Sequence, residues 1–311
     1  MTLVIAGYNH SKSLDYSSFA SDTTEVYEPV MEVNGLFVMA DSAITSHAGG
    51  RTWLNGFRKI HTLEAKLWKP YFQPDGSFKD YQEVYETNEL FVAFAGSTLT
   101  AQHIINSIHG HLGQLRISYE RASLSSPVEY KVIRHCQKNL LVSDYGSYWD
   151  DDTFTNRDFE GLLTADVIAN VIEYSVNDAL RSASSYKLSM EEFRDMHTEI
   201  VAGIWCPVSK KHDLYVYRMQ SRPGDDGVLT AFTSKELIPS GSVAVLGMRR
   251  TFESRAQEAF ETAIGKFIAP DRTLWAFLND AIDEVQASES KEIDRPATLR
   301  TLERGRVRRV Y

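Results

Sequence analysis

The chain has 311 residues and 43% hydrophobic content, so it is long enough for one large globular domain or two ordinary ones. Its formal net charge of -9 argues against a general nucleic-acid binder, because neutralising phosphates requires a basic surface. Two cysteines are too few for a disulfide framework or a cysteine-based metal site, and no uncharged apolar run reaches membrane-spanning length. We expect a cytoplasmic protein that has no metal or other cofactor and binds neither nucleic acid nor membranes.

The first predicted strand lies at the start of the chain. Thr2 opens an apolar run over residues 2–7, with only Met1 in front of it. If Met1 is removed, Thr2 carries a hydroxyl nucleophile and a free α-amine, which is the adjacent base that a weak hydroxyl needs. Thr2 is therefore a candidate nucleophile. Many chains begin with Met-Thr, however, and a β-branched residue at a strand start is ordinary.

Residues 8–32 are rich in Ser, Thr, Asp and Glu, which indicates a long loop or insertion. This segment contains a competing nucleophile, Thr23 or Thr24, that removal of a propeptide would expose. The charges after Thr24, together with Pro29, make a poor buried strand. Thr2 begins a much better one.

Two further strands follow. Residues 35–40 form a continuous apolar run that ends at Asp41, as expected for a strand buried on both faces. Residues 56–63 alternate well enough for another strand and contain Lys59. Residues 66–88 include two prolines and an Asp-Gly turn, and they predict a second insertion in the form of a hairpin.

The middle of the chain predicts a strand over residues 89–95 that ends at Gly96, and then a helix over 100–115 with apolar residues at helical spacing. Residues 119–162 have weak periodicity and indicate a third insertion. A second helix is predicted from a capping signal at Thr164 to about residue 185.

The last third begins with two predicted strands, 199–206 and 213–219, joined in a hairpin pattern. A strand over 242–246, helices near 251–268 and 272–286, and a final strand over 305–311 complete the order. Four arginines crowd the last eight residues: Arg304, Arg306, Arg308 and Arg309. This basic end is either a solvated edge strand or a docking element for an acidic neighbour.

This order of elements is not an alternating βαβ pattern, so a doubly wound parallel sheet is disfavoured. We expect an α+β fold in which two antiparallel sheets pack face to face with helices on both outer faces, a four-layer αββα sandwich. No linker is evident. The prediction is a single domain over residues 1–311 with insertions near 8–32, 66–88 and 119–162.

Four short motifs occur in the order seen in proteasome β subunits and HslV peptidases. They are Thr-Leu-Val-Ile-Ala at residues 2–6, Gly-Leu-Phe-Val-Met-Ala-Asp-Ser-Ala-Ile-Thr at 35–45, Arg-Lys-Ile at 58–60 and Phe-Ala-Gly-Ser-Thr at 94–98. The chain resembles this family of N-terminal-nucleophile hydrolases. The resemblance is strongest over residues 1–7, 33–61 and 89–110.

The resemblance implies a role for each matching residue. Thr2 matches the nucleophile, while Asp41 and Lys59 match the carboxylate and the lysine that support it electrostatically. Gly96 matches the glycine whose N–H faces the developing oxyanion. Thr45 matches the threonine whose main chain pairs with an extended peptide substrate. Each residue also has an ordinary structural explanation in a turn, on a solvated face or at a strand end.

The sequence departs from the family pattern at two places. A methionine, Met248, stands where a serine near the nucleophile is usual, and it cannot donate a hydroxyl hydrogen bond. The nearest match to a later Asp-x-x-Ser element starts at Asp294, with Ala297 in the serine position. The sequence does not decide whether Met248 and Asp294 replace the missing site elements.

The sequence therefore favours a threonine peptidase or amidase that hydrolyses peptide bonds in a peptide or protein substrate after Met1 is removed. Two alternatives stay open: a non-catalytic relative that keeps the fold for self-assembly into a ring or scaffold, and a hydrolase of small amides. By resemblance we expect a homo-oligomer, with a ring among the arrangements. Whether an ATPase partner feeds the site is open.

Overall fold

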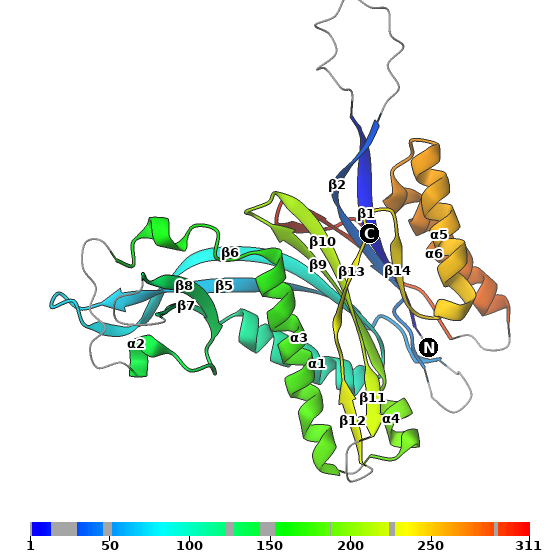
Figure 1. Cartoon of the computed structure of the whole chain (residues 1–311). Coiled ribbons are helices and arrows are strands. Elements are labelled where there is room, and N and C mark those ends of the chain that lie inside the picture. Colours follow the sequence, from blue (N-terminus) through cyan, green and yellow to red (C-terminus); the bar gives the residue numbers. More distant parts are fainter. Residues whose placement is uncertain are drawn as a thin grey trace, which may run out of the picture.

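Two β-sheets pack face to face at the centre of the computed structural model (Figure 1). The structure describes residues 2–13, 30–45, 52–121, 127–143, 153–186, 188–223, 228–288 and 292–311. Met1, Thr23 and Thr24 lie outside the described residues. The competition between Thr2 and the two later threonines is therefore a matter for experiment.

The five-stranded sheet carries the start of the chain near its middle. Its strand order is β14-β1-β2-β15-β16. The strands are β1 (Leu3–Ser13), β2 (Val30–Ala40), β14 (Val243–Gly247), β15 (Thr298–Glu303) and β16 (Arg306–Arg309). All of their pairings are antiparallel. Because β1 has a neighbour on each side, Thr2 is held at the end of a well-supported strand.

The seven-stranded sheet has the order β13-β10-β9-β6-β5-β7-β8. Its strands are β5 (Ile60–Phe72), β6 (Phe78–Gly96), β7 (Leu115–Glu120), β8 (Glu129–Arg134), β9 (Thr198–Cys206), β10 (Lys211–Arg218) and β13 (Lys235–Ile238). One pairing departs from the expected antiparallel pattern, because β5 and β7 run parallel. Helix α1 (Thr98–Leu112) lies between β6 and β7 in the chain, which allows β7 to return in the direction of β5.

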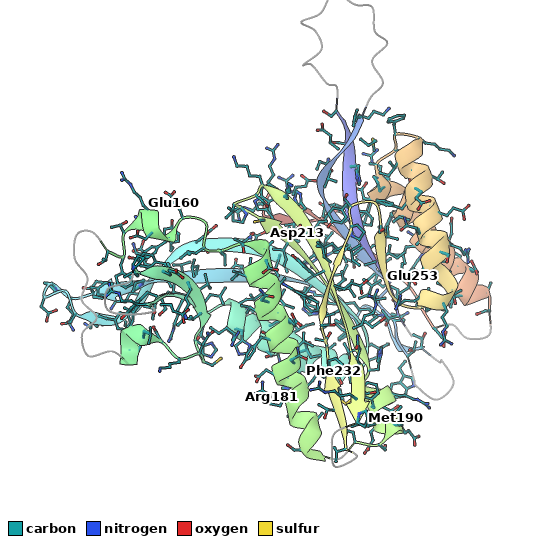
Figure 2. All side chains as sticks on the ribbon, viewed as in Figure 1. Glu160, Arg181, Met190, Asp213, Phe232 and Glu253 are labelled. Carbon is teal, nitrogen blue, oxygen red and sulfur yellow. The ribbon has the colours of Figure 1, made fainter. Side chains whose placement is uncertain are left out.

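Three apolar clusters define the layers. One lies between the two sheets and includes Val4, Val38, Phe91 and Val201. A second lies between the seven-stranded sheet and helices α1 and α3 (Ala165–Arg181), and a third between the five-stranded sheet and helices α5 (Arg249–Gly265) and α6 (Pro270–Ala287). Side chains fill the spaces between these layers (Figure 2). The expected α+β class is confirmed, and apolar clusters join helices to each of the two sheets.

The first two strands are longer than the sequence indicated. β1 continues to Ser13 and β2 begins at Val30, so residues 8–13 and 30–32 belong to strands and not to a loop. Polar side chains obscured this, because the two strands satisfy each other's backbone groups whether or not their side chains are buried. Residues 14–29 lie outside the described part of the chain.

Residues 66–88 form the outer part of the long β5–β6 hairpin, which projects sideways from the two-sheet body (Figure 1). The described residues of 119–162 contain β8 and two short helices, α2 (Leu140–Ser143) and a 3-10 helix (Asn156–Phe159). A 3-10 helix (Ser182–Tyr186) and α4 (Met190–Met196) follow α3. Two small hairpins pair β3 (Ile44–Thr45) with β4 (Thr52–Leu54), and β11 (Gln220–Pro223) with β12 (Leu229–Phe232).

The expected capping signal of the second long helix is present. The Thr164 hydroxyl accepts a hydrogen bond from the Val167 N–H at 3.2 Å, at the start of α3. Within the described part of the chain, no helix has the length and apolar content that crossing a membrane requires.

Candidate active site

Thr2 lies at the edge of the space between the two sheets and is 6% exposed. Its hydroxyl oxygen accepts a hydrogen bond from the Lys59 ammonium, with Nζ and Oγ1 3.0 Å apart. Its carbonyl oxygen accepts the Met248 N–H at 3.1 Å. Both the side chain and the main chain of Thr2 are therefore held by groups far from it in the sequence.

Asp41 and Lys59 form a buried ion pair directly behind the Thr2 hydroxyl. Lys59 Nζ lies 2.9 Å from each Asp41 carboxylate oxygen, and the two residues are 1% and 4% exposed, respectively. The carboxylate also accepts the N–H groups of Leu3 and Ala43, each at 2.9 Å. A buried carboxylate with four such contacts is well satisfied, so it can hold the lysine in one orientation.

The charge state of Lys59 reflects two opposed effects. Burial lowers the pKa of its ammonium group, while the Asp41 charge and the hydrogen bonds to it act in the opposite direction. The lysine therefore sits beside a hydroxyl in a site where its proton is less strongly held than in water. Such a group polarises a neighbouring oxygen more effectively than a solvated one.

The chain reverses direction between Asp41 and Lys59, and this brings the two residues together. Ser42, which follows Asp41, accepts the Phe57 N–H on its carbonyl oxygen and the Gly56 N–H on its hydroxyl. These contacts close the segment that includes the β3–β4 hairpin, so that Lys59 returns to its partner. The interval of 59 − 41 = 18 residues in the sequence accommodates this hairpin.

Gly96 lies at the end of β6, paired with Thr198 of β9. Its φ of +111° favours glycine, and a Cβ at this position would lie 2.2 Å from the His197 carbonyl oxygen. The backbone therefore requires a glycine here for structural reasons alone. Its expected role toward an oxyanion stays a prediction.

Thr45 is the second residue of β3, and its main chain pairs with Thr52 of β4. This pairing occupies one edge of the short strand. The expected pairing of Thr45 with an extended substrate would have to use the other edge, and it stays a prediction.

Met248 contacts Thr2 through its main chain, and Asp294 contacts the segment between Asp41 and Lys59 through its side chain and its main chain. Met248 contributes its main-chain N–H to the Thr2 carbonyl oxygen. The Asp294 carboxylate accepts the Asn55 side-chain amide at 2.8 Å, and its carbonyl oxygen accepts the Ser42 N–H at 3.2 Å. Asp294 thus supports the segment that joins Asp41 to Lys59.

Gly247, next to Met248, makes an unusually close approach to Thr2. It pairs with Leu3 across β14 and β1, and its φ is +83°. A Cβ at this position would lie 1.9 Å from the Thr2 carbonyl oxygen. Only glycine allows the turn to fit against Thr2 in this way.

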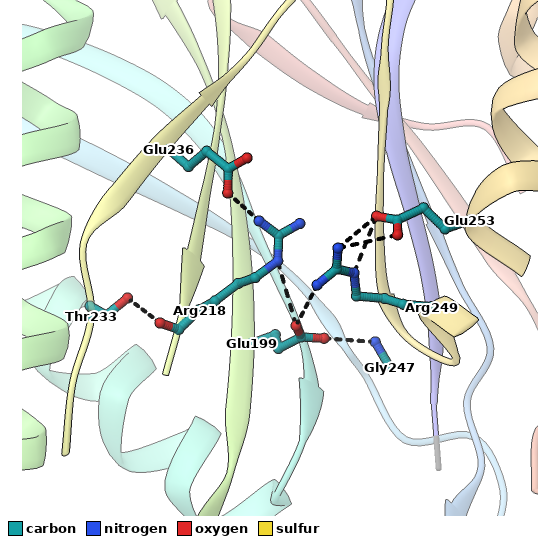
Figure 3. Close-up of polar contacts among 7 residues, drawn as sticks. All are labelled: Glu199, Arg218, Thr233, Glu236, Gly247, Arg249 and Glu253. Atoms are coloured by element: carbon teal, nitrogen blue, oxygen red, sulfur yellow. Dashed lines mark hydrogen bonds and ion pairs between the residues drawn. The ribbon is translucent and has the colours of Figure 1, made fainter. Parts of the chain in front are cut away.

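Glu199 is a buried residue of the site that the sequence reasoning missed. Its Oε2 accepts the Gly247 N–H at 2.9 Å, and its Oε1 lies 3.6 Å from Arg218 Nε and 3.9 Å from Arg249 Nη1 (Figure 3). Arg218 also pairs with Glu236, and Arg249 with Glu253. The network joins β9 and β10 of one sheet to the β14–α5 turn of the other, beside Thr2.

The sequence contained one signal for Glu199. It is a charged residue near the start of an otherwise apolar strand, where an acid is uncommon unless it has partners. Its contact with Gly247 spans 48 residues, so the partner was not visible in the local pattern.

Comparisons with known proteins add little to this geometry. No protein-family model and no curated protein matches the chain. Among solved structures, the chain is similar to Anbu (ancestral beta-subunit) from Yersinia bercovieri, with 12% sequence identity and a TM-score of 0.44. The match covers 99% of this chain and 87% of that one.

These findings correct one expectation from the sequence. Membership of the proteasome β-subunit and HslV peptidase family is wrong as a family assignment, because no family model matches and the structural similarity is remote. The short motifs that suggested it cover only a few strands. Function must therefore be argued from the site's own chemistry.

Proposed function

We propose that this protein is a hydrolase that uses Thr2 as an N-terminal nucleophile and cleaves peptide or other amide bonds. The observation that carries the proposal is the Lys59 ammonium, which contacts the Thr2 hydroxyl oxygen and both Asp41 oxygens inside a buried site. A lysine held in this way next to a hydroxyl favours the deprotonated oxygen.

The reaction begins when loss of Met1 leaves a free α-amine on Thr2. The Thr2 oxygen attacks the carbonyl carbon of the substrate, and its proton passes to the α-amine. When the tetrahedral intermediate collapses, the C–N bond breaks, and the departing amine takes that proton. An ester between Thr2 and the acyl group remains. Water attacks this ester while the α-amine accepts a proton from it, and that proton passes to the Thr2 oxygen as the ester C–O bond breaks and the acid is released.

The other residues act on Thr2 or on the developing charge. Lys59 stabilises the attacking oxygen, and Asp41 keeps the lysine oriented and charged. Gly96 would present its N–H to the oxyanion. Gly247 and Met248 hold the Thr2 main chain, and Glu199 holds Gly247.

The non-catalytic alternative predicts a different environment for Lys59. A protein that kept the fold only for assembly would have no need for a buried lysine at the Thr2 hydroxyl, and an exposed or distant Lys59 would have favoured it. Lys59 is instead buried and bonded to both partners, which supports the catalytic proposal. Assembly into a homo-oligomer is a separate proposal, and a hydrolase can also form a ring.

The proposed chemistry specifies the bond that reacts but not the rest of the substrate. The proposed chemistry acts on an amide carbonyl, whether in a peptide or in a small molecule. Thr45 in β3 stays the predicted position at which an extended peptide would pair with the main chain, as added strands do in other recognition sites. Profiling unstructured peptides against small amides distinguishes the two classes.

The proposal is tested by intact-mass measurement followed by activity assays on the Met1-free protein. We expect hydrolysis of peptide or amide probes, loss of that activity in Thr2→Ala, and partial retention in Thr2→Ser, which keeps a hydroxyl. Thr23→Ala and Thr24→Ala are the matched controls and should remain active. Activity that persists in Thr2→Ala, or a fully retained Met1 in an active preparation, contradicts the proposal.

A further inference from the structure

Among the described residues, three arginines near the candidate active site form no ion pair with an aspartate or glutamate, whereas some arginines elsewhere do. In the described parts of the molecule, Arg255 pairs with Glu284, and Arg306 pairs with Glu89. Within the same described residues, no ion pair joins Arg58, Arg300 or Arg309 to an aspartate or glutamate, and Arg309 Nε donates to the main-chain oxygen of Tyr311 at 3.2 Å. The chain has 42 acidic residues against 33 lysines and arginines, so a shortage of acids does not explain this.

The strand register places two of these charges opposite each other. Arg300 of β15 and Arg309 of β16 are direct partners in an antiparallel pair. Side chains of such partners lie on the same face, only about 5 Å apart at Cβ, where like charges are destabilising. The neighbouring pair, Leu302 and Val307, packs into the cluster between the sheets, so the two arginines point toward the same side.

The Arg300 guanidinium is incompletely satisfied. One of its Nη atoms donates to the Thr62 hydroxyl on β5, but its Nε is buried and has no hydrogen-bond acceptor. Burial, followed by the charges of Arg58 and Arg309, lowers the pKa of Arg300. The positive charge of Arg58, just before β5, therefore acts on the same group.

We propose that Arg58, Arg300 and Arg309 form a binding site for an oxyanion, either a phosphate or a carboxylate group of a ligand. Guanidinium groups match the geometry of these anions and bind them through two hydrogen bonds at once. A bound anion supplies a negative charge that no aspartate or glutamate of the described residues provides to these three arginines. The repulsion between the arginines then becomes attraction for the ligand.

The location of this arginine site connects it to the candidate active site. Two residues before Arg300, Thr298 pairs with Ala40, which directly precedes Asp41. Two residues of strand span about 7 Å. Arg58 is adjacent to Lys59 in the chain. Binding of the anion itself does not depend on Thr2 being a nucleophile.

The test is calorimetric titration of the full-length protein with two probes at constant ionic strength and neutral pH. Inorganic phosphate is one probe, and an acetylated, amidated tri-glutamate peptide is the other, so that the two sources of an oxyanion are separated. We expect at least one probe to bind, and Arg58→Gln and Arg309→Gln each to raise its dissociation constant about tenfold. Binding of either probe that depends on these arginines supports the site and identifies its ligand chemistry.

Arg255→Gln is the matched control, because it removes an exposed guanidinium that already has the Glu284 carboxylate as its partner. It should leave both dissociation constants unchanged. Without a multivalent anion, Arg309→Gln should melt at the same temperature as the wild type or higher, because a like charge is removed. Failure of both probes to bind, or unchanged binding in Arg58→Gln and Arg309→Gln, overturns the proposal.

Discussion

Arg58 and Lys59 are consecutive in the chain, yet they belong to two opposite kinds of charge cluster. Lys59 is buried, and its positive charge is balanced by the Asp41 carboxylate, which also accepts hydrogen bonds from two backbone N–H groups. Arg58 is exposed and acts on Arg300, another positive group. The first cluster is complete within the protein, and the second is completed only by a ligand if the proposed anion site is correct.

The comparison shows that a buried charge needs a partner of opposite charge, whereas an exposed charge does not. A buried ion pair that loses one partner leaves an unpaired charge in a poorly solvated place, and this costs several kcal/mol. Exposed arginines tolerate the absence of a partner, because water solvates them. Substitutions in the complete, buried cluster and in the residues that support it should therefore have the largest effects.

The largest effect is expected for Lys59→Met. This change leaves the Asp41 carboxylate buried with only two backbone donors, so the free energy of unfolding should fall by about 3 kcal/mol. Hydrolysis should fall about 100- to 1,000-fold, because the group that stabilises the attacking oxygen is lost. Denaturant unfolding and steady-state kinetics measure the two effects.

Lys66→Met is the control for this change. Lys66 is on β5, the strand that begins directly after Lys59, but it is partly exposed and pairs with Glu64 at the surface. Its removal should alter the unfolding free energy by less than about 1 kcal/mol. Equal effects of the two changes would show that the Lys59 cluster is no more than a surface-type ion pair.

Gly247→Ala should also be strongly destabilising. The new Cβ would meet the Thr2 carbonyl oxygen, and the positive φ adds backbone strain, for a combined cost of about 3 kcal/mol. Gly265→Ala is the control, because a Cβ there meets nothing and α5 tolerates alanine. Thermal unfolding distinguishes them, and a neutral Gly247→Ala would disprove the close approach to Thr2.

His212 is a buried base, and no carboxylate of the described residues bonds to its ring, in contrast to Lys59 with its Asp41 partner. Burial lowers the pKa of His212 to about 4. The unfolded chain binds a proton near the ordinary histidine pKa of about 6.5, so folding stability should fall as the pH drops from about 6.5 to about 4.

The loss over this interval should be about 2 kcal/mol, and His212→Gln should reduce it. The measurement is the free energy of unfolding across the pH series for both proteins. A residual slope that is the same in His212→Gln would assign the acid sensitivity to other groups.

A smaller effect is expected for Glu199→Gln. The amide oxygen can still accept the Gly247 N–H, but the charge facing Arg218 and Arg249 is lost, which should cost about 1 kcal/mol. If Glu199 positions Thr2 through Gly247, kcat should fall while KM is unchanged. Glu236→Gln, at the exposed end of the same network, should change neither value.

Much of the fold could be predicted from short-range pattern. The apolar run that begins β1, the buried run of β2 ending at Asp41, and the amphipathic spacing of α3 all reflect local periodicity. The motifs also suggested that Thr2, Asp41 and Lys59 belong together, and the structure brings them into contact. Their catalytic roles remain proposals.

The features that the sequence did not predict are those in which a residue depends on a partner far away in the chain. Strand continuation to Ser13 was hidden by polar side chains, and the parallel placement of β7 beside β5 left no local signature. The family assignment failed because short motifs carry less information than a match over the whole chain.

The sequence by itself determined the class of fold, the strand that carries Thr2, and the types of group available for chemistry. Only the tertiary structure decided which groups meet: Lys59 with Thr2 across 57 residues, Glu199 with Gly247 across 48, and Arg300 with Arg309 across two paired strands. The physical reason is that secondary structure follows from local periodicity, whereas burial and pairing of charge depend on how distant strands align.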